Sequence, residues 1–216
     1  MTMNLTLMGV AAIVAMGTVS VTAPAQAFTI SAEAPGTFFS TVPGTTTVDF
    51  ETGLPGNYAG GGVVSGSLAG QYAQPLNDAT RYLTLGGSNE PSPVTINLAS
   101  LHDYFGLYWG SIDRYNSIEF FSGGTSVGAF TGAVVAGATG LTADGGQFSN
   151  ASNRYVNFFA GAGEAFDRIV LTSTSPAFES DNHAFRQVPT PALLPGLIGL
   201  GAGLWRKRRQ SGKVTG

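Results

Sequence analysis

The feature of this sequence that most restricts its fold is a series of short strand-like runs separated by glycine-rich or Asx-rich breaks. Between residues 28 and 187, no segment keeps the 3.6-residue apolar period that an amphipathic helix requires. We therefore predict strands over residues 45–50, 82–85, 94–98, 104–109, 117–121, 126–130, 155–159, 167–172 and 178–185. The stretch 134–146 is rich in alanine and glycine and fits neither pattern.

These runs predict an all-β domain over residues 28–187, an antiparallel two-layer β-sandwich that is jelly-roll-like. Ser-Gly-Gly-Thr at 122–125 predicts a hairpin turn, because glycine adopts positive φ without steric cost. An aromatic content of 11% is enough to fill the space between two sheets. A β-solenoid is the alternative, but the sequence shows no repeat of roughly 20 residues.

The predicted β-domain is acidic, whereas the C-terminal end of the chain is basic. Residues 28–190 contain all 13 acidic side chains and five arginines, but no lysine. An excess of negative charge repels phosphate backbones, so we expect no nucleic-acid partner. The absence of cysteine excludes a disulfide scaffold, cysteine-ligated zinc and thiol catalysis.

The N-terminus predicts export. Residues 5–16 form the apolar run LTLMGVAAIVAM, which is short for a permanent membrane span. Ala25 and Ala27 form an A-x-A pattern, which predicts a helical signal peptide over residues 1–27 that signal peptidase removes. Residues 1–4 carry no lysine or arginine, which is unusual for a signal peptide. The alternative is an amphiphilic N-terminal helix or a short membrane anchor.

The C-terminus has three parts in a fixed order. Pro189, Thr190 and Pro191 precede 14 apolar or small residues at 192–205, and a basic cluster follows at once. A 14-residue helix covers roughly 21 Å, whereas the hydrocarbon core of a bilayer is about 30 Å thick. The helix can therefore cross the bilayer only if the bilayer thins locally or if the flanking arginine side chains extend to the membrane surface. The basic cluster should stay cytoplasmic, and it consists of Arg206, Lys207, Arg208 and Arg209. The alternative is a buried helix with a basic C-terminus.

This C-terminal layout resembles the PEP-CTERM sorting signal, and PTPALLPGLIGLG is similar to its cyanobacterial form. Thr190 stands where that signal usually has glutamate. The body resembles a family of exosortase-dependent surface proteins of unknown function, through SAEAPG, YFGLYWGSIDRYNSIEFF and FESDNHAF. The resemblance implies transient tethering to the inner membrane by residues 188–216. It also implies cleavage near Pro189–Pro191 by an exosortase, and a final location at the cell surface or outside the cell.

We expect from this a non-catalytic surface or extracellular-matrix protein associated with exopolysaccharide. The alternatives are a lectin-like carbohydrate-binding module and a secreted glycan hydrolase. A hydrolase would need two carboxylates in one cleft, and the acids considered are Asp113, Glu119, Asp144 and Glu164.

The two histidines give little support for catalysis. Ser100, His102 and Asp103 are close in sequence, but neighbours in a strand point to opposite faces. No G-x-S-x-G turn accompanies them. We therefore expect His102 to be a loop residue before a strand, and His183 to be structural.

Paired carboxylates suggest a structural calcium ion, although no cofactor is certain. Acids at i and i+2 of a strand project from one face, as in the pair Asp49 and Glu51 and the pair Glu179 and Asp181. Jelly-roll carbohydrate-binding modules hold calcium between their first and last strands, and this resemblance implies Asp49, Glu51, Asp181 and Asn182 as ligands. The alternative is that these acids are solvated charges that discourage edge aggregation.

Aromatic side chains suggest a glycan surface, because sugar rings stack on exposed aromatic rings. Tyr104 and Tyr108 share one face of the run 104–109 and are the predicted glycan contacts, with Tyr115 nearby. Trp109 lies on the other face with Phe105, which is typical of a core tryptophan.

Overall fold

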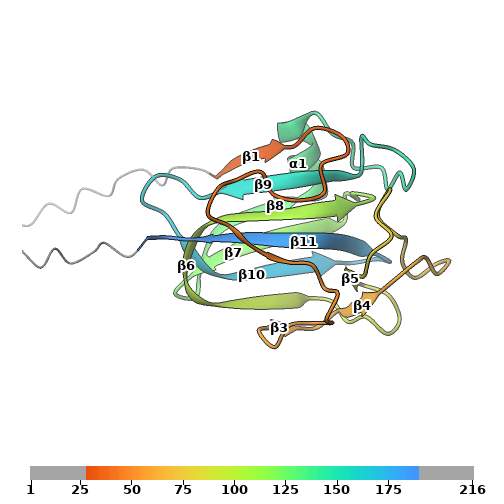
Figure 1. Ribbon diagram of the computed structural model, residues 1–216, viewed down its shortest axis with the longest axis horizontal. Helices are drawn as coiled ribbons and strands as arrows, with labels where there is room; N and C mark the ends of the chain where they lie inside the picture. The colour runs from red at the N-terminus through yellow and green to blue at the C-terminus, as the bar shows by residue number, and fades with distance from the viewer. Residues whose placement is uncertain (1–27, 190–216) are drawn as a thin grey trace, which may run out of the picture.

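A computed structural model describes residues 28–189 of the chain (Figure 1). The predicted signal peptide and residues 190–216 of the predicted sorting signal lie outside this range. Among the residues described, no helix is long and apolar enough to cross a membrane.

The described residues are mostly β-structure, as predicted, with one short helix. The elements are β1 (Thr29–Ala32), β2 (Thr46–Val48), β3 (Tyr58–Ala59), β4 (Gly62–Val64), β5 (Tyr82–Leu85), β6 (Val94–Gly110), β7 (Asn116–Ser122), β8 (Thr125–Thr131), α1 (Gly132–Thr139), β9 (Arg154–Phe159), β10 (Phe166–Ser173) and β11 (Phe178–Gln187).

Strand β6 joins two layers of antiparallel strands. Its first part, residues 94–97, pairs with β3 on one side and with β10 on the other, and β7 and β8 continue this layer. Its second part, residues 104–109, pairs with β9 and β11. Strand β1 extends the second layer beyond β9, and β5, β4 and β2 extend it beyond β11. The all-β, antiparallel, sandwich-like fold is therefore confirmed, and the solenoid alternative is excluded.

One apolar cluster contains side chains from both parts of β6 and from both layers. Trp109 of β6 is fully buried and stacks on Phe178 of β11, with ring centroids 4.5 Å apart and planes 9° from parallel. Phe105 lies in the same cluster as Phe120 of β7, 6.1 Å away. Burial of each such ring contributes about 1.5–3 kcal/mol. The core assignment of Trp109 and Phe105 is confirmed.

A second cluster forms on the outer face of the β6–β9–β11 layer. Tyr104, Tyr108 and Tyr155 are its buried aromatic members, and Phe38 and Val42 pack against them. The segment before β2 therefore covers this face of the sheet, so the face that the sequence predicts for glycan contact is buried.

The structure differs from the sequence prediction around His102 and in the stretch 134–146. The runs 94–98 and 104–109 form one continuous strand, which contains His102, so this residue does not lie in a loop. Helix α1 occupies part of the unassigned stretch: the Thr131 side chain accepts the Val134 N–H at its start, and Gly140 adopts φ 73° at its end.

The predicted hairpin at 122–125 is confirmed. Ser122 of β7 lies opposite Thr125 of β8, and Gly123 and Gly124 adopt φ of 54° and 90°. Positive φ at both central positions is typical of the two-residue turns that match the twist of paired strands.

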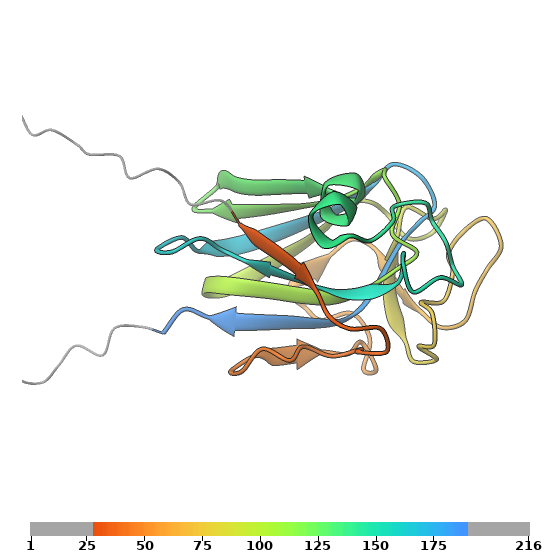
Figure 2. The same ribbon diagram turned by 90° about the horizontal axis from the view of Figure 1, so that it is seen from above.

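Both ends of the described chain lie at one end of the sandwich (Figures 1 and 2). Thr29 of β1 lies opposite Phe159 of β9, which lies opposite Tyr104 of β6, and Tyr104 lies opposite Arg186 of β11. The beginning of β1 and the end of β11 are therefore at the same end of the sheet. Glu179, near the beginning of β11, lies beside Gly110 at the opposite end. The loops at that opposite end form the candidate site.

Candidate functional site

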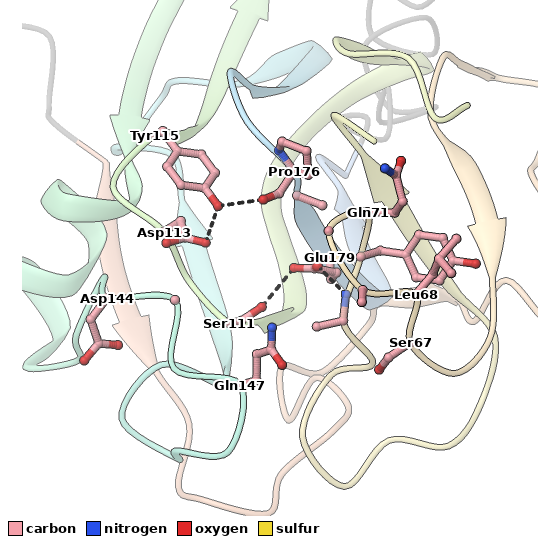
Figure 3. Close-up of a pocket in the computed structure, with 16 residues that line it drawn as sticks. Ser67, Leu68, Gln71, Ser111, Asp113, Tyr115, Asp144, Gln147, Pro176 and Glu179 are labelled. Atoms are coloured by element: carbon pink, nitrogen blue, oxygen red, sulfur yellow. Dashed lines mark hydrogen bonds between the residues drawn. The ribbon is translucent and has the colours of Figure 1, made fainter. Parts of the chain in front are cut away.

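A polar cleft of about 600 Å³ opens at the end of the sandwich opposite the described chain ends (Figure 3). Four segments line it: 67–73, 111–115, 144–147 and 176–179. They follow or precede β4, β6, α1 and β11, so the sheet layers position loops that are far apart in sequence. The volume falls in the range of about 300–1,000 Å³ that is typical of small-ligand sites.

Glu179 lies at the bottom of the cleft and is 2% exposed. Its Oε1 accepts the Ala73 N–H at 2.7 Å, and its Oε2 accepts the Ser111 hydroxyl at 2.9 Å (Figure 3). Burial raises the pKa of Glu179 to about 7, although both hydrogen bonds oppose the shift. The carboxyl group therefore ties two loops together and changes charge near neutral pH.

Asp113 and Tyr115 form the wall opposite Glu179. The Tyr115 hydroxyl lies 2.6 Å from Asp113 Oδ2 and 3.0 Å from the Pro176 carbonyl oxygen, as Figure 3 shows. Burial, assisted by the charge of Asp144, raises the pKa of Asp113, and the bond from Tyr115 lowers it. Tyr115 thus holds this carboxylate in place and joins it to the segment before β11.

The outer rim of the cleft carries side chains that donate hydrogen bonds and side chains that accept them. Asp144 and Gln147 are exposed on one side, and Ser67 and Gln71 lie on the other. Asp144 accepts the Gly146 N–H at 3.1 Å, which fixes the local turn. The part of the lining that the structure describes contains three acids and no lysine or arginine.

The cleft can make hydrogen bonds to a neutral, polyhydroxylated molecule. Carboxylates accept two or more bonds, amide side chains both donate and accept, and tyrosine adds an apolar ring with a polar tip. Glu179 and Asp113 also meet part of the requirement for acid–base chemistry, since two carboxyl groups with raised pKa line one cleft.

The structure brings together only some of the acids that the sequence offered for catalysis. Asp113 and Asp144 form an antiparallel bridge and line the cleft. Glu119 lies in β7, and Glu164 lies in the turn before β10, so neither lines it. Glu179 was considered only as a metal ligand, and its place in this cleft depends on loops from three other parts of the chain.

The structure corrects the glycan-contact prediction. Tyr104 is 0% exposed and Tyr108 is 2% exposed, and a buried ring has no face on which a sugar can stack. Their hydroxyls are also engaged: Tyr104 donates to Asn157 Oδ1 at 2.6 Å, and Tyr108 donates to the Leu76 carbonyl at 2.7 Å. Of the aromatic set, Tyr115 alone lines the cleft.

The histidines form no catalytic arrangement in the described chain. His102 Nδ1 lies 2.8 Å from the backbone carbonyl of Ser100, not from its hydroxyl. His183 is fully buried between the Tyr58 hydroxyl, at 3.0 Å, and the Ser180 hydroxyl, at 2.9 Å. Burial lowers the pKa of His183 to about 3, so the ring is neutral, in line with the predicted structural role.

The predicted calcium ligands lie near one another, but not around one point. Strands β2 and β11 are neighbours, and Asp49, Glu51 and Asn182 line a second cavity. Backbone groups engage the first two, since Asp49 accepts the Glu51 N–H and Glu51 accepts the Arg81 N–H. Within residues 28–189, no group of three or more His, Cys, Asp or Glu side chains is arranged to hold a metal ion. Asp49, Glu51 and Asp181 therefore do not form the predicted three-carboxylate site.

Most of the predicted processing residues lie outside the described range. Ala25, Ala27, Thr190, Pro191 and the cluster 206–209 are among them, whereas Pro189 is the last residue described. Export and sorting therefore stay predictions from the sequence.

No protein-family model matches the chain, and no curated protein matches it significantly. Among solved structures, it is similar to the catalytic unit of a thermostable GH87 α-1,3-glucanase from Streptomyces thermodiastaticus strain HF3-3. The identity is 18%, the TM-score is 0.34, and the match covers 69% of this chain and 28% of that one.

A catalytic domain of GH87 α-1,3-glucanase in complex with tetrasaccharides gives 14% identity and a TM-score of 0.33, over 79% of this chain and 30% of that one. The chain thus spans less than a third of either protein. Similarity at this level carries no argument about function.

Proposed function

We propose that this chain is an exported surface or extracellular-matrix protein whose β-sandwich binds neutral glycan in the end cleft, without catalysis. The observation that carries the proposal is the cleft itself: a cavity of about 600 Å³ lined by amide, hydroxyl, carboxylate and tyrosine side chains. These are the groups that exchange hydrogen bonds with sugar hydroxyls in place of water.

The position of the cleft supports display at a surface. The two ends of the described chain, next to the predicted signal peptide and sorting tail, lie at one end of the sandwich (Figures 1 and 2), and the loops that line the cleft lie at the other end. A domain tethered by its C-terminus would therefore direct the cleft away from the point of attachment. Exopolysaccharide is the partner that this arrangement favours, with signal peptidase and an exosortase as processing partners.

A glycan array tests the binding proposal. We expect the purified chain to bind neutral oligosaccharides, and to bind polymers of uronic acid weakly, because the acids of the cleft repel anionic sugars. Absence of binding to any neutral glycan would contradict the proposal.

A secreted glycan hydrolase is the second candidate, and one observation favours it. Asp113 and Glu179 line the same cleft, and burial raises the pKa of Glu179 to about 7, near the value that a general acid needs. Release of reducing ends from a bound glycan, lost in both Glu179→Gln and Asp113→Asn, would establish hydrolysis. Binding without such release would support the non-catalytic proposal.

The calcium ion that the sequence predicted is not part of this proposal, because Asp49, Glu51 and Asp181 do not form a three-carboxylate site. The end cleft does not require it, because the cleft lies between other loops and its acids are bonded to protein donors.

A further inference from the structure

Phe148 is the most exposed large apolar side chain of the described residues, with 90% of its surface open to solvent. It directly follows Gln147, which lines the end cleft (Figure 3). Leu68 is a second exposed apolar side chain, and it lines the cleft from the segment 67–73. A single exposed apolar residue is common on a protein surface. Two features make Phe148 different: its place beside the cleft and the way its turn is held.

Buried side chains hold the turn that carries Phe148. The Gly146 carbonyl oxygen accepts the Ser149 N–H at 3.3 Å, which closes a four-residue turn with Phe148 at one corner. The same oxygen accepts the Ser152 hydroxyl at 2.7 Å and the Asn153 side-chain amide at 2.7 Å. Asn153 also donates to the Ser149 carbonyl oxygen at 2.9 Å. Ser152 and Asn153 are both buried, so the turn is fixed at its beginning and at its end.

Asn153 also connects this turn to the bottom of the cleft. Its Oδ1 accepts the Ser111 N–H at 2.9 Å, and the Ser111 hydroxyl donates to Glu179 at 2.9 Å. Hydrogen bonds therefore run from Glu179 through Ser111 and Asn153 to the turn. Because these groups are buried, they fix the backbone of Phe148 relative to the cleft. A preorganised group loses less conformational freedom when a ligand binds.

The ring of Phe148 supplies a kind of contact that the polar cleft does not. Side chains in the cleft can bond to the hydroxyl groups at the edge of a sugar ring. The faces of a pyranose ring carry C–H groups and are apolar. A phenyl ring that covers such a face removes apolar surface of both partners from water. Phe148 has no polar tip, so this contact needs no hydrogen bond.

We propose that Phe148 forms a second sugar subsite at the mouth of the cleft. One unit of a glycan chain lies in the cleft, and the ring of Phe148 stacks on the C–H face of a unit that extends over the rim beside Gln147. This inference rests on the proposed glycan binding and narrows the ligand to linear, neutral oligosaccharides that are long enough to leave the cleft. A monosaccharide or disaccharide would occupy the cleft alone.

Calorimetric titration of the purified full chain with oligosaccharides of increasing length tests the subsite. The probes are linear β-1,4-linked oligosaccharides of glucose, mannose and galactose, each from two to six units. In a series that binds, the longest members should bind about 10-fold more tightly than the disaccharide, because they also cover the ring.

Phe148→Ala should lose this gain and keep the affinity for the disaccharide. Its side chain is exposed, so the substitution leaves the core intact. A statistical gain from the greater number of units in a long chain persists in Phe148→Ala, so the difference between the two proteins measures the contact with the ring. Phe148→Tyr keeps an aromatic ring and should keep the gain.

Phe39→Ala is the matched control. Phe39 is also an exposed phenylalanine, but it lines the second cavity and not the end cleft. Its substitution should leave the affinity for every length unchanged. Gln147→Ala should instead weaken the short and the long oligosaccharides alike, because Gln147 belongs to the cleft itself.

The results that overturn the inference differ from those that overturn glycan binding. If the unsubstituted chain binds no series at all, the proposed function and the subsite both fail. If it binds a series and Phe148→Ala binds every length equally well, only the subsite fails. A loss that is equal at every length would place the ring within the cleft site and would also contradict a second subsite.

Sedimentation velocity separates the subsite from self-association. We expect the unsubstituted chain and Phe148→Ala to sediment identically as monomers at the concentrations of the titration. A dimer of the unsubstituted chain that Phe148→Ala converts to a monomer would mean that a second copy of the chain covers the ring, and the inference would be wrong.

Discussion

Replacing Glu179 by glutamine should change how the stability of the protein depends on pH. The side chain keeps its shape, its amide oxygen can still accept the Ala73 N–H, and its NH₂ group can donate to the Ser111 hydroxyl. What disappears is the proton that the buried carboxyl group binds. The substitution therefore isolates one titration with little change in packing.

The sign and the size follow from the pKa. Burial raises the pKa of Glu179 from 4.5 to about 7, so between these values the folded state holds a proton that the unfolded state has lost. The contribution of Glu179 to stability is complete below pH 4.5, falls as the pH rises, and is constant above about pH 7. A shift of this size corresponds to at most about 3 kcal/mol.

Urea unfolding followed by circular dichroism, at pH values from 4 to 9 and in chelator, measures the effect. At pH 4 the variant should match the unsubstituted chain within about 1 kcal/mol. At pH 8–9 it should be more stable, by up to about 3 kcal/mol. A stability difference that stays constant across the whole range would refute the argument that burial perturbs this carboxyl group.

Four further outcomes follow from the structure and the sequence. Gly106→Ala should destabilise the fold by about 1–3 kcal/mol in a thermal melt, because the new methyl group would overlap the Tyr104 hydroxyl. Asp103→Asn should change the free energy of unfolding by less than about 1 kcal/mol, because its salt bridge to Arg186 is partly exposed. Mass spectrometry of protein from the native host should find the signal peptide and the tail removed, and neutral residues at 206–209 should impair sorting. Surface-exposed protein with an intact basic cluster would contradict exosortase processing.

The local parts of the fold could be predicted from the sequence. Because successive side chains of a strand point to opposite faces, the sequence correctly predicted Phe105 and Trp109 on the core face. The glycine pair at 123–124 correctly predicted the hairpin. Both signals depend only on residues that are neighbours in the sequence. Strands β1, β3 and β4 were missed. They have two to four residues, so they carry no periodic signal and form only because longer strands offer them a partner.

The site depended on tertiary structure that no local pattern contains. Asp113 was a candidate, but its meeting with Glu179 requires β6 to end beside the beginning of β11. Tyr104 and Tyr108 were expected on an exposed face, and a loop that includes Phe38 covers them instead. Alternation shows which residues share a face, and it cannot show what packs on that face.

The central claim is that the end cleft binds glycan, and a matched pair of substitutions tests it most directly. Gln147 is exposed and lines the cleft, whereas Gln187 is exposed at the other end of the sandwich. For a neutral oligosaccharide identified on the array, calorimetric titration should show that Gln147→Ala weakens binding about 10-fold, equivalent to about 1.4 kcal/mol, because the variant loses the amide hydrogen bonds to the sugar. Gln187→Ala should leave the affinity unchanged. Equal affinities for the two variants and the unsubstituted chain would contradict the account, because the glycan would then bind elsewhere.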